Sequence, residues 1–400
     1  MILARVKGQC RSQKVRRKTN TPSSLICLGN SWNSKKGKHM ELLKEEFSPA
    51  DFKATKTNSI KYSRQDFLQL PYITTDFEWK DYSPAVFRRM LELDSIDYDQ
   101  YQLSICGHRT LKEVCLPGRH GRVIVSSNDN RFVIKTLRKS ELKVYLEMLP
   151  NYYRHVKKYR ASLLKKLYGL HVVRPAGGIK HVSNLEGWRY HVRLFNRPRA
   201  CSKTIIEDRA ILKDLDFDFC FYLDPLVRAR LLAQVKYDCE FLEAEGIMDY
   251  SFLLGIHIEA SHEGSIDENA SRSSSAKKKT DDTSEQNESS ELTLADICDL
   301  LDRPGFKFGD RLPARAVRAF RNEMESKSYR SCTSAQECFK VLLIFGIVDF
   351  CQNYNMKKRI EHACKAIKYD SKSIKTVNPK AYSSRFQEFL SAIFLPEESD

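Results

Sequence analysis

Six stretches of the chain have the apolar spacing or the flanking residues of a helix. The first follows Pro84, which suits the first position of a helix, with Asp81 or Ser83 as its cap. Pro150 is expected to separate two consecutive helices, because proline interrupts the helical hydrogen-bond ladder. The expected helices span residues 85–94, 140–148, 152–167, 216–246, 314–325 and 383–394.

Shorter runs of β-branched or alternating apolar residues predict strands. They span residues 122–125, 131–137, 251–258 and 341–348. No internal repeat is visible, and an acidic low-complexity insert, residues 259–291, separates a first half of the chain from a mixed second half. The order of elements predicts an α+β fold.

The charge of the chain is strongly positive and unevenly spread. Lys and Arg number 67 against 51 Asp and Glu, which gives a net charge of +16. Residues 1–40 hold six Lys, four Arg and no acidic residue, so they account for ten of these charges. Residues 1–76 are therefore expected to be a basic, mostly disordered tail. A solvated tail, a nuclear-import patch, a transit peptide and a contact with anionic lipid all stay open for it.

Composition excludes several protein classes. Hydrophobic residues make up 42% of 400, which is enough for a core. None of the twelve cysteines forms a C-x-x-C pair, so neither a zinc site nor a dithiol redox site is expected. The sequence shows neither a secretory signal nor an apolar run of the roughly 18 residues that span a bilayer. We expect an intracellular protein with a polyanionic partner: nucleic acid, an acidic membrane or a phosphorylated ligand.

A glycine turn and a strand lysine suggest phosphate binding. Gly118 and Gly121 would let the backbone approach phosphates, and Lys135 in the following strand would supply a fixed cation. Glu141, six residues later at a helix start, would orient Lys135 through an ion pair. Taken singly, the glycines also fit a purely structural turn, and Glu141 also fits a surface carboxylate.

Two aspartates lie at the ends of apolar strands. Asp249 precedes the strand 251–258, where it is either a cap or a general base beside an alcohol nucleophile. Asp349 ends the strand 341–348, where a carboxylate is costly unless it is paired or metal-bound. Two such aspartates and a strand lysine suit phosphoryl transfer with Mg²⁺. Residues 357–380 then carry eight basic and two acidic groups, which form either a solvated face or a surface for a polyanionic substrate.

The order of these pieces resembles that of the phosphatidylinositol phosphate kinases. The resemblance is to the short plant phosphatidylinositol 4-phosphate 5-kinases without MORN repeats, and it runs from about Trp79 to Phe394. It is carried by WKDYSPAVFRRMLELD, LPGRHGRVIVSSNDNRFVIKTLRKSELK, CEFLEAEGIMDYSFLLGIH and FGIVDFCQNYNMKKRIEH. The family implies a two-lobed kinase-like fold with antiparallel sheets and flanking helices over residues 77–396, with an N-lobe at 77–180 and a C-lobe at 211–396.

The resemblance also implies roles for the candidate residues. Lys135 would bind the phosphates of ATP, and Asp249 would be the catalytic-loop aspartate. Asp349 would hold Mg²⁺. Gly118, Gly121 and Glu141 would complete the nucleotide site. In the activation-loop region, about residues 350–381, Lys357 and Lys358 would meet the inositol phosphates, and Glu361 is the residue type found in members that use the 4-phosphate.

The implied reaction transfers the γ-phosphate of ATP to the 5-hydroxyl of phosphatidylinositol 4-phosphate and gives the 4,5-bisphosphate. The implied partner is this lipid in anionic membranes. The protein would be cytoplasmic and peripheral at the plasma membrane, while a homodimer and a nuclear pool stay open. Nucleic acid is not expected, because the aromatic residues follow core periodicity rather than lying among exposed basic residues.

One segment departs from the family. Between Gly177 and Ile211 the chain lacks the motif V-M-G-N, which ends the hinge strand, and the motif D-L-K-G-S, which contributes to the nucleotide-phosphate site. Residues 181–210 therefore look like the product of a mis-spliced gene or of a diverged isoform. The alternative function is a catalytically impaired relative that still binds phosphoinositides.

Overall fold

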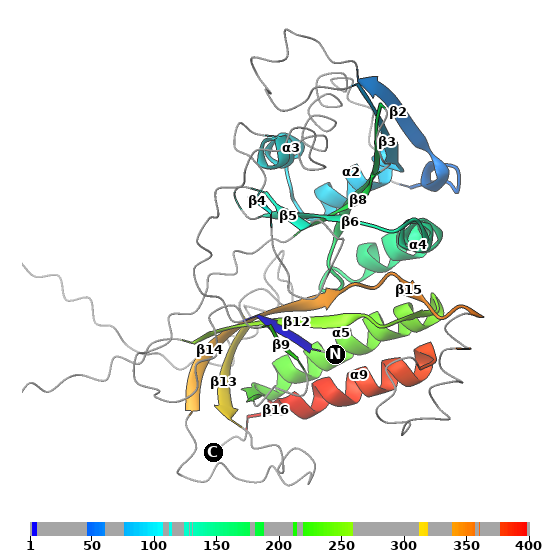
Figure 1. Cartoon of the computed structure of the whole chain (residues 1–400). Helices are drawn as coiled ribbons and strands as arrows, with labels where there is room; N and C mark the ends of the chain where they lie inside the picture. The colour runs from blue at the N-terminus through cyan, green and yellow to red at the C-terminus, as the bar shows by residue number, and fades with distance from the viewer. Residues whose placement is uncertain are drawn as a thin grey trace, which may run out of the picture.

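The computed structural model of the chain describes residues 2–5, 46–60, 76–106, 112–113, 124–127, 129, 131–176, 181–187, 211–213, 219–258, 312–318, 338–356, 360 and 377–397. These residues form two lobes, each built on a seven-stranded sheet, with a long helix lying between them (Figure 1). The expected α+β class is confirmed. Both sheets are mainly antiparallel, and two strand pairs of the C-lobe sheet are parallel.

The N-lobe sheet has the strand order β2-β3-β7-β8-β6-β5-β4 and is antiparallel throughout. The strand β2 pairs along its whole length with β3, so the expected lobe boundary at residue 77 falls inside the folded sheet. The strands are β2 (Thr55–Ile60), β3 (Phe77–Tyr82), β4 (Lys112–Glu113), β5 (Ile124–Ser126), β6 (Phe132–Thr136), β7 (Leu167–Pro175) and β8 (His181–Gly187).

The N-lobe helices are α2 (Pro84–Leu93), α3 (Tyr98–Cys106) and α4 (Lys139–Lys158). Helix α2 begins at Pro84 as predicted and buries its apolar face. Ser83 occupies the cap position, but its hydroxyl donates to the carbonyl of Phe52 at 2.7 Å instead of capping the helix.

Helix α4 corrects the prediction of two helices. Pro150 lies inside a single helix, and the helix ends at Lys158. The buried face runs on without a break from Met148 to Tyr152, so tertiary packing outweighs the missing backbone donor of the proline. Leu167, predicted as the end of the second helix, is the first residue of β7.

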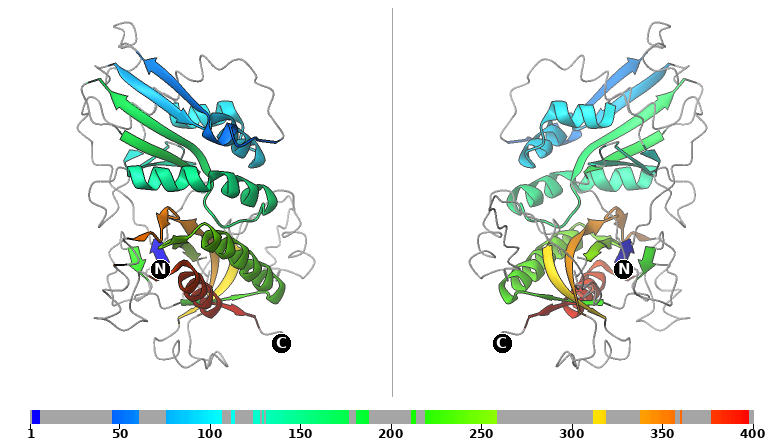
Figure 2. Two further views of the ribbon diagram at one scale, coloured as in Figure 1. Left: turned by 90° about the vertical axis from the view of Figure 1, so that its right-hand side faces the viewer. Right: turned by 90° about the vertical axis from the view of Figure 1, so that its left-hand side faces the viewer.

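The C-lobe sheet has the order β16-β10-β13-β14-β12-β1-β9. Helices α5 (Pro225–Ala244) and α9 (Pro379–Ile393) lie side by side against it (Figure 2). The strands are β1 (Ile2–Arg5), β9 (Ile211–Lys213), β10 (Phe219–Leu223), β12 (Ser251–Ile258), β13 (Leu312–Arg318), β14 (Cys338–Val348) and β16 (Phe394–Pro396).

Two C-lobe predictions are wrong in part. The helix expected over 314–325 begins as the strand β13, which pairs with β14 and buries Ala316 in the sheet. The helix expected over 216–246 starts only at Pro225, after the strand β10. Asp224 caps it by accepting from the backbone N–H groups of Leu226 and Val227 at 2.8 and 3.1 Å. Asp224 is thus the N-cap of this helix, and Pro225 occupies its first position.

The two lobes are joined by backbone pairing. The segment that returns from α4 to β7 runs beside the C-lobe strand β14: Lys165 donates its N–H to the carbonyl of Ile347 at 2.9 Å. Ile347 in turn donates to the carbonyl of Leu163 at 2.8 Å. A chain segment from one lobe is therefore hydrogen-bonded to the sheet of the other.

A buried carboxylate strengthens the same junction. Asp238 of α5 is fully buried and accepts from Ser162 Oγ at 2.8 Å and from the N–H of Leu163 at 2.7 Å. It also lies 2.6 Å from His155 Nε2 of α4 and accepts from Gln234 Nε2 at 3.1 Å. One side chain thus ties together both long helices and the segment that links the lobes.

Candidate active site

Lys135 and Asp349 meet between the lobes. Lys135 lies in β6 of the N-lobe and is only 3% exposed, and its ammonium forms an ion pair with the carboxylate of Asp349 directly after β14 of the C-lobe. A buried ammonium is costly without a charged partner, and this pairing supplies one. Asp349, which was expected to be paired or metal-bound, is therefore paired with Lys135.

The two aspartates lie at facing bends. The short strands β11 (Ile247–Met248) and β15 (Gln352–Asn353) pair with each other, as do β12 and β14. Residues 249–250 link β11 to β12, and residues 349–351 link β14 to β15. Because these strands pair with one another, the two bends lie opposite each other. Their approach follows from the two registers Met248–Gln352 and Ser251–Val348.

Both aspartates have a strained backbone. Asp249 has φ 60° and Asp349 has φ 62°, in the left-handed region that residues with a side chain seldom adopt. Among the described residues other than glycine, only Ser83 and Ser95 share this feature. Strain of this kind persists where the surrounding structure imposes it, and it concentrates at functional sites.

Asp249 is exposed, but its neighbour Tyr250 is firmly anchored. The hydroxyl of Tyr382 in α9 donates to the carbonyl of Tyr250, and the Tyr250 ring packs edge-on against Tyr382 and Phe386, at centroid distances of 4.7 and 4.9 Å. Burial raises the pKa of the Tyr250 hydroxyl, which therefore stays neutral. The residue next to Asp249 is therefore fixed to helix α9.

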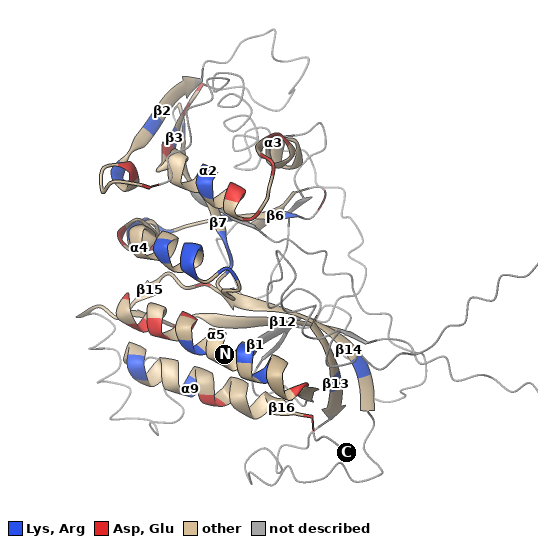
Figure 3. Cartoon of the chain, turned by 180° about the vertical axis from the view of Figure 1, so that it is seen from behind, with Lys and Arg blue, Asp and Glu red and all other residues tan. Residues whose placement is uncertain are grey.

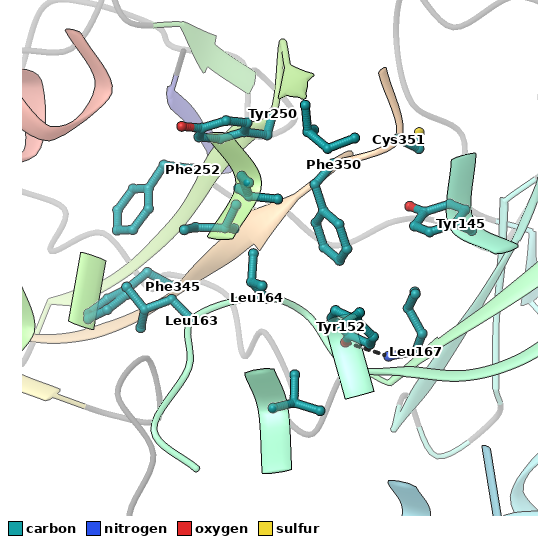
Figure 4. Close-up of a cluster of buried hydrophobic side chains, with 14 of the residues drawn as sticks. Tyr145, Tyr152, Leu163, Leu164, Leu167, Tyr250, Phe252, Phe345, Phe350 and Cys351 are labelled. Atoms are coloured by element: carbon teal, nitrogen blue, oxygen red, sulfur yellow. Dashed lines mark hydrogen bonds between the residues drawn. The ribbon is translucent and has the colours of Figure 1, made fainter. Parts of the chain in front are cut away.

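Phe350 fixes the other bend to helix α4. Its ring packs edge-on against Tyr145 and stacked against Tyr152, with centroids 5.9 and 5.8 Å apart (Figure 4). The Tyr152 hydroxyl donates to the carbonyl of Lys165 at 3.0 Å and accepts from the N–H of Leu167 at 3.2 Å. The sequence interpretation overlooked Phe350, although the Asp–Phe pair at the end of an apolar strand was a visible signal.

Glu141 lies on the side of α4 that faces this site. Its carboxylate accepts from the N–H of Arg138 at 2.8 Å and so caps the first turn of the helix. Burial raises the pKa of the nearby Cys351 thiol to about 12, with Lys135 lowering it and Glu141 and Asp349 raising it. All three charged groups therefore surround one thiol, while the predicted orienting role of Glu141 toward Lys135 stays a prediction.

Five candidate residues lie outside the described part of the chain. They are Gly118, Gly121, Lys357, Lys358 and Glu361. On either side of the two lysines, Met356 and Ile360 are 66% and 61% exposed, which the sequence interpretation did not single out. Within the described residues, no helix is long and apolar enough to cross a bilayer.

The hinge position holds a strand despite its unusual sequence. Residues 181–187 form β8, which pairs with both β6 and β7, so the chain returns to the sheet next to Lys135. The register pairs Lys135 with Asn184. The departure from the family motifs therefore leaves this strand of the sheet in place.

Comparison with known proteins identifies the family. The family model described as Phosphatidylinositol-4-phosphate 5-Kinase matches residues 105–393, including the segment 181–210. The chain belongs to this family. It is 39% identical over 422 residues to phosphatidylinositol 4-phosphate 5-kinase 10 of Arabidopsis thaliana, and the match covers 88% of this chain and 98% of that kinase. It is 40% identical over 351 residues to the 5-kinase 1 of the same plant, covering 82% of this chain and 46% of that kinase.

The relatives agree with the predicted family. The matches to the 5-kinases 10 and 1 confirm the resemblance to the plant phosphatidylinositol 4-phosphate 5-kinases. No finding supports a catalytically impaired relative.

Proposed function

We propose that this chain is a lipid kinase that phosphorylates the 5-hydroxyl of phosphatidylinositol 4-phosphate with ATP. The observation that carries the proposal is the convergence of Lys135 and the two strained aspartates between the lobes of a chain in this family. The names of the relatives support the choice of lipid.

In this reaction Lys135 would neutralise phosphate charge. Its ammonium is held by Asp349, so it is already positioned between the lobes before the nucleotide arrives. Nucleotide phosphates would draw the ammonium toward them and leave the Asp349 carboxylate to a divalent cation. This pair is therefore a preorganised charge site, which is the main contribution that proteins make to phosphoryl transfer.

The residues present fit a magnesium ion. Mg²⁺ is usually held by one or two carboxylates together with substrate phosphates, and Asp349 supplies such a carboxylate with a partly exposed side chain. Within the described residues, no group of three or more His, Cys, Asp or Glu side chains is placed to hold a metal ion by itself, so the phosphates would complete the coordination. The ion would offset charge on the transferred phosphoryl group.

Asp249 would act on the lipid hydroxyl. Its exposed carboxylate would accept the hydroxyl proton while the hydroxyl oxygen forms its bond to the γ-phosphorus. The bond from that phosphorus to the bridging oxygen breaks, and ADP leaves with the electron pair. The products are ADP and the 4,5-bisphosphate lipid, with the proton on Asp249.

The lipid would be met at the surface of an anionic membrane. Exposed Met356 and Ile360 flank three consecutive basic residues, Lys357, Lys358 and Arg359, so apolar and basic groups lie close together there, as in segments that lie on acidic membranes. In this proposal Glu361 selects the 4-phosphate lipid, and the protein is peripheral at the plasma membrane. A homodimer and a nuclear pool are separate questions for localisation and sedimentation measurements.

The test is a lipid kinase assay with the purified chain, labelled ATP, Mg²⁺ and vesicles containing phosphatidylinositol 4-phosphate. Wild type should form the bisphosphate, whereas Lys135→Met and Asp349→Ala should lower the rate at least a hundredfold, about 2.7 kcal/mol of transition-state stabilisation. Lys236→Met, an exposed lysine of α5, is the matched control and should keep the wild-type rate.

Two results would contradict the proposal. Wild type that binds the vesicles without forming product would favour the impaired relative, and activity in both site variants would exclude the assigned roles. If Lys357→Glu/Lys358→Glu leaves vesicle binding unchanged, the membrane role of this segment is wrong.

A further inference from the structure

Helix α9 supports the bend that carries Asp249. It lies beside α5 in the C-lobe (Figure 3), and it also contacts β11, the strand that leads into this bend. From the first turn of α9, the hydroxyl of Tyr382 donates to the carbonyl of Tyr250. A side chain 132 positions away in sequence therefore holds the residue that directly follows the proposed base.

The backbone of Asp249 needs such a support. Its φ of 60° lies in the left-handed region, where a residue with a side chain stays only if the surrounding structure imposes it. Strand pairing holds the chain at Met248 before the bend and at Ser251 after it. Between these two positions, the Tyr382 hydroxyl holds the carbonyl of Tyr250 from outside the sheet.

The ring of Tyr250 makes further contacts with the two long C-lobe helices. It is fully buried (Figure 4) and packs edge-on against Tyr382 and Phe386, which lie about one turn apart on α9. Its hydroxyl donates to the thiol of Cys239 in α5 at 3.6 Å. A rotation of Tyr250 would therefore break contacts with both helices.

Tyr382 can position another residue because its own helix is fixed at both ends. Asn378 caps the start of α9 by accepting from the N–H of Ala381 at 2.8 Å. At the other end, the guanidinium of Arg228 in α5 donates to the carbonyl of Phe394 at 2.7 Å. The buried Tyr382 side chain thus extends from a helix that has little freedom to move.

We propose that Tyr382 is a positioning residue for Asp249 in the phosphoryl transfer. Its hydroxyl fixes the backbone next to Asp249 and so keeps the carboxylate where it accepts the proton of the lipid hydroxyl. The inference rests on the proposed function, in which Asp249 is the base. Rates depend steeply on such placement, since a misplacement of about 1 Å can cost about a hundredfold.

The test is Tyr382→Phe in the full chain, which keeps the buried ring and removes only the donor. The assay uses labelled ATP, Mg²⁺ and vesicles containing phosphatidylinositol 4-phosphate. We expect kcat to fall about tenfold or more, because the base is misplaced. The KM for ATP should stay within about twofold, because the substitution leaves the ion pair between Lys135 and Asp349 in place.

A double-mutant cycle shows whether the hydroxyl acts through Asp249. Asp249→Asn should leave a low residual rate, and adding Tyr382→Phe should change that rate by less than about twofold. A residue that only stabilises the fold would lower the rate by the same factor in both backgrounds. The cycle therefore separates positioning from stability.

Tyr168→Phe is the matched control. Tyr168 is also a buried tyrosine, and its hydroxyl donates to the Asp94 carboxylate at 2.6 Å within the N-lobe. The control loses the same chemical group and should lower the melting temperature, but its kcat should stay within about twofold of wild type. Thermal melting of both variants verifies that they are folded and shows how much stability each has lost.

Hydrogen exchange tests the bend without catalysis. Peptides that cover residues 247–252 should exchange faster in Tyr382→Phe than in wild type, whereas those of β6 should be unchanged. Wild type that forms no bisphosphate would refute the proposed function, and exchange would then decide by itself whether Tyr382 holds the bend.

Three results would overturn the positioning role. The first is an unchanged kcat or unchanged exchange in Tyr382→Phe. The second is an equal loss of rate in the wild-type and Asp249→Asn backgrounds. The third is a control whose kcat falls as far as that of Tyr382→Phe.

Discussion

Asp238 offers a direct test of how the two lobes are held together. Replacing it with alanine removes the acceptor from four buried partners, which belong to α4, α5 and the linking segment. A buried donor without an acceptor costs about 1–3 kcal/mol, so four independent losses would sum to about 4–12 kcal/mol. Water that enters the vacated space would accept some of these hydrogen bonds and so reduce the loss of stability. Removing one partner of a buried charged network typically costs about 3–5 kcal/mol, which is the loss that we expect.

The measurement is urea denaturation followed by circular dichroism, with stability read from the midpoint and the slope. Asp238→Asn keeps one carbonyl oxygen and should cost about half as much as Asp238→Ala. Glu240→Ala is the control on the same helix: its ion pair with Lys236 is 3.9 Å long and exposed, so its loss should cost less than about 0.5 kcal/mol. A cost below about 1 kcal/mol for Asp238→Ala, with an unchanged slope, would refute the assigned role.

Four further outcomes are expected. Phe350→Ala removes a buried ring between Tyr145 and Tyr152 and should cost about 3–5 kcal/mol in urea denaturation; a loss under about 1 kcal/mol would contradict the packing. Cys351 should resist iodoacetamide in the native chain, while exposed Cys338 reacts, as mass spectrometry of the peptides will show; equal rates would disprove its burial. Because folding raises the Cys351 pKa from 9.0 to about 12, its contribution to stability should be complete below pH 9 and decline as the pH rises toward 12. Gly346→Ala would bring a methyl group to 3.1 Å from the carbonyl of Leu163 and against the Lys165 side chain, so the melting temperature should fall, and an unchanged one would argue against the close lobe junction.

Local patterns predicted the parts of the fold that local chemistry decides. Pro84 marked the start of α2, and the apolar run before Asp349 is the strand β14. The patterns failed where distant contacts decide. Pro150 suggested a helix end, but the buried face on both sides of it keeps α4 continuous. The residues of β13 resembled a helix until their pairing with β14 was known.

In the candidate site, too, local patterns predicted the residues but not the contacts between them. Lys135 was expected at the phosphates of ATP and Asp349 at the magnesium ion, each from its own strand, and the structure brings them into contact across 214 positions of sequence. That contact could not be derived from spacing, because it depends on how the lobes are joined. The positive φ angles of Asp249 and Asp349 were equally out of reach, since sequence reports residue type and not backbone conformation. The family resemblance filled this gap by supplying the order of the motifs.

The pairing of residues 163–165 with β14 has a consequence for motion. Because two backbone hydrogen bonds hold this segment to Ile347, the lobes share a fixed point at the bridge between Leu164 and Ile347. Any opening or closing of the space between them would therefore be a rotation about that point rather than a separation. The strained bends around Asp249 and Asp349 begin only a few residues away, at the end of the same strand pair. They would move little in such a rotation, while the far edge of the N-lobe sheet would move the most.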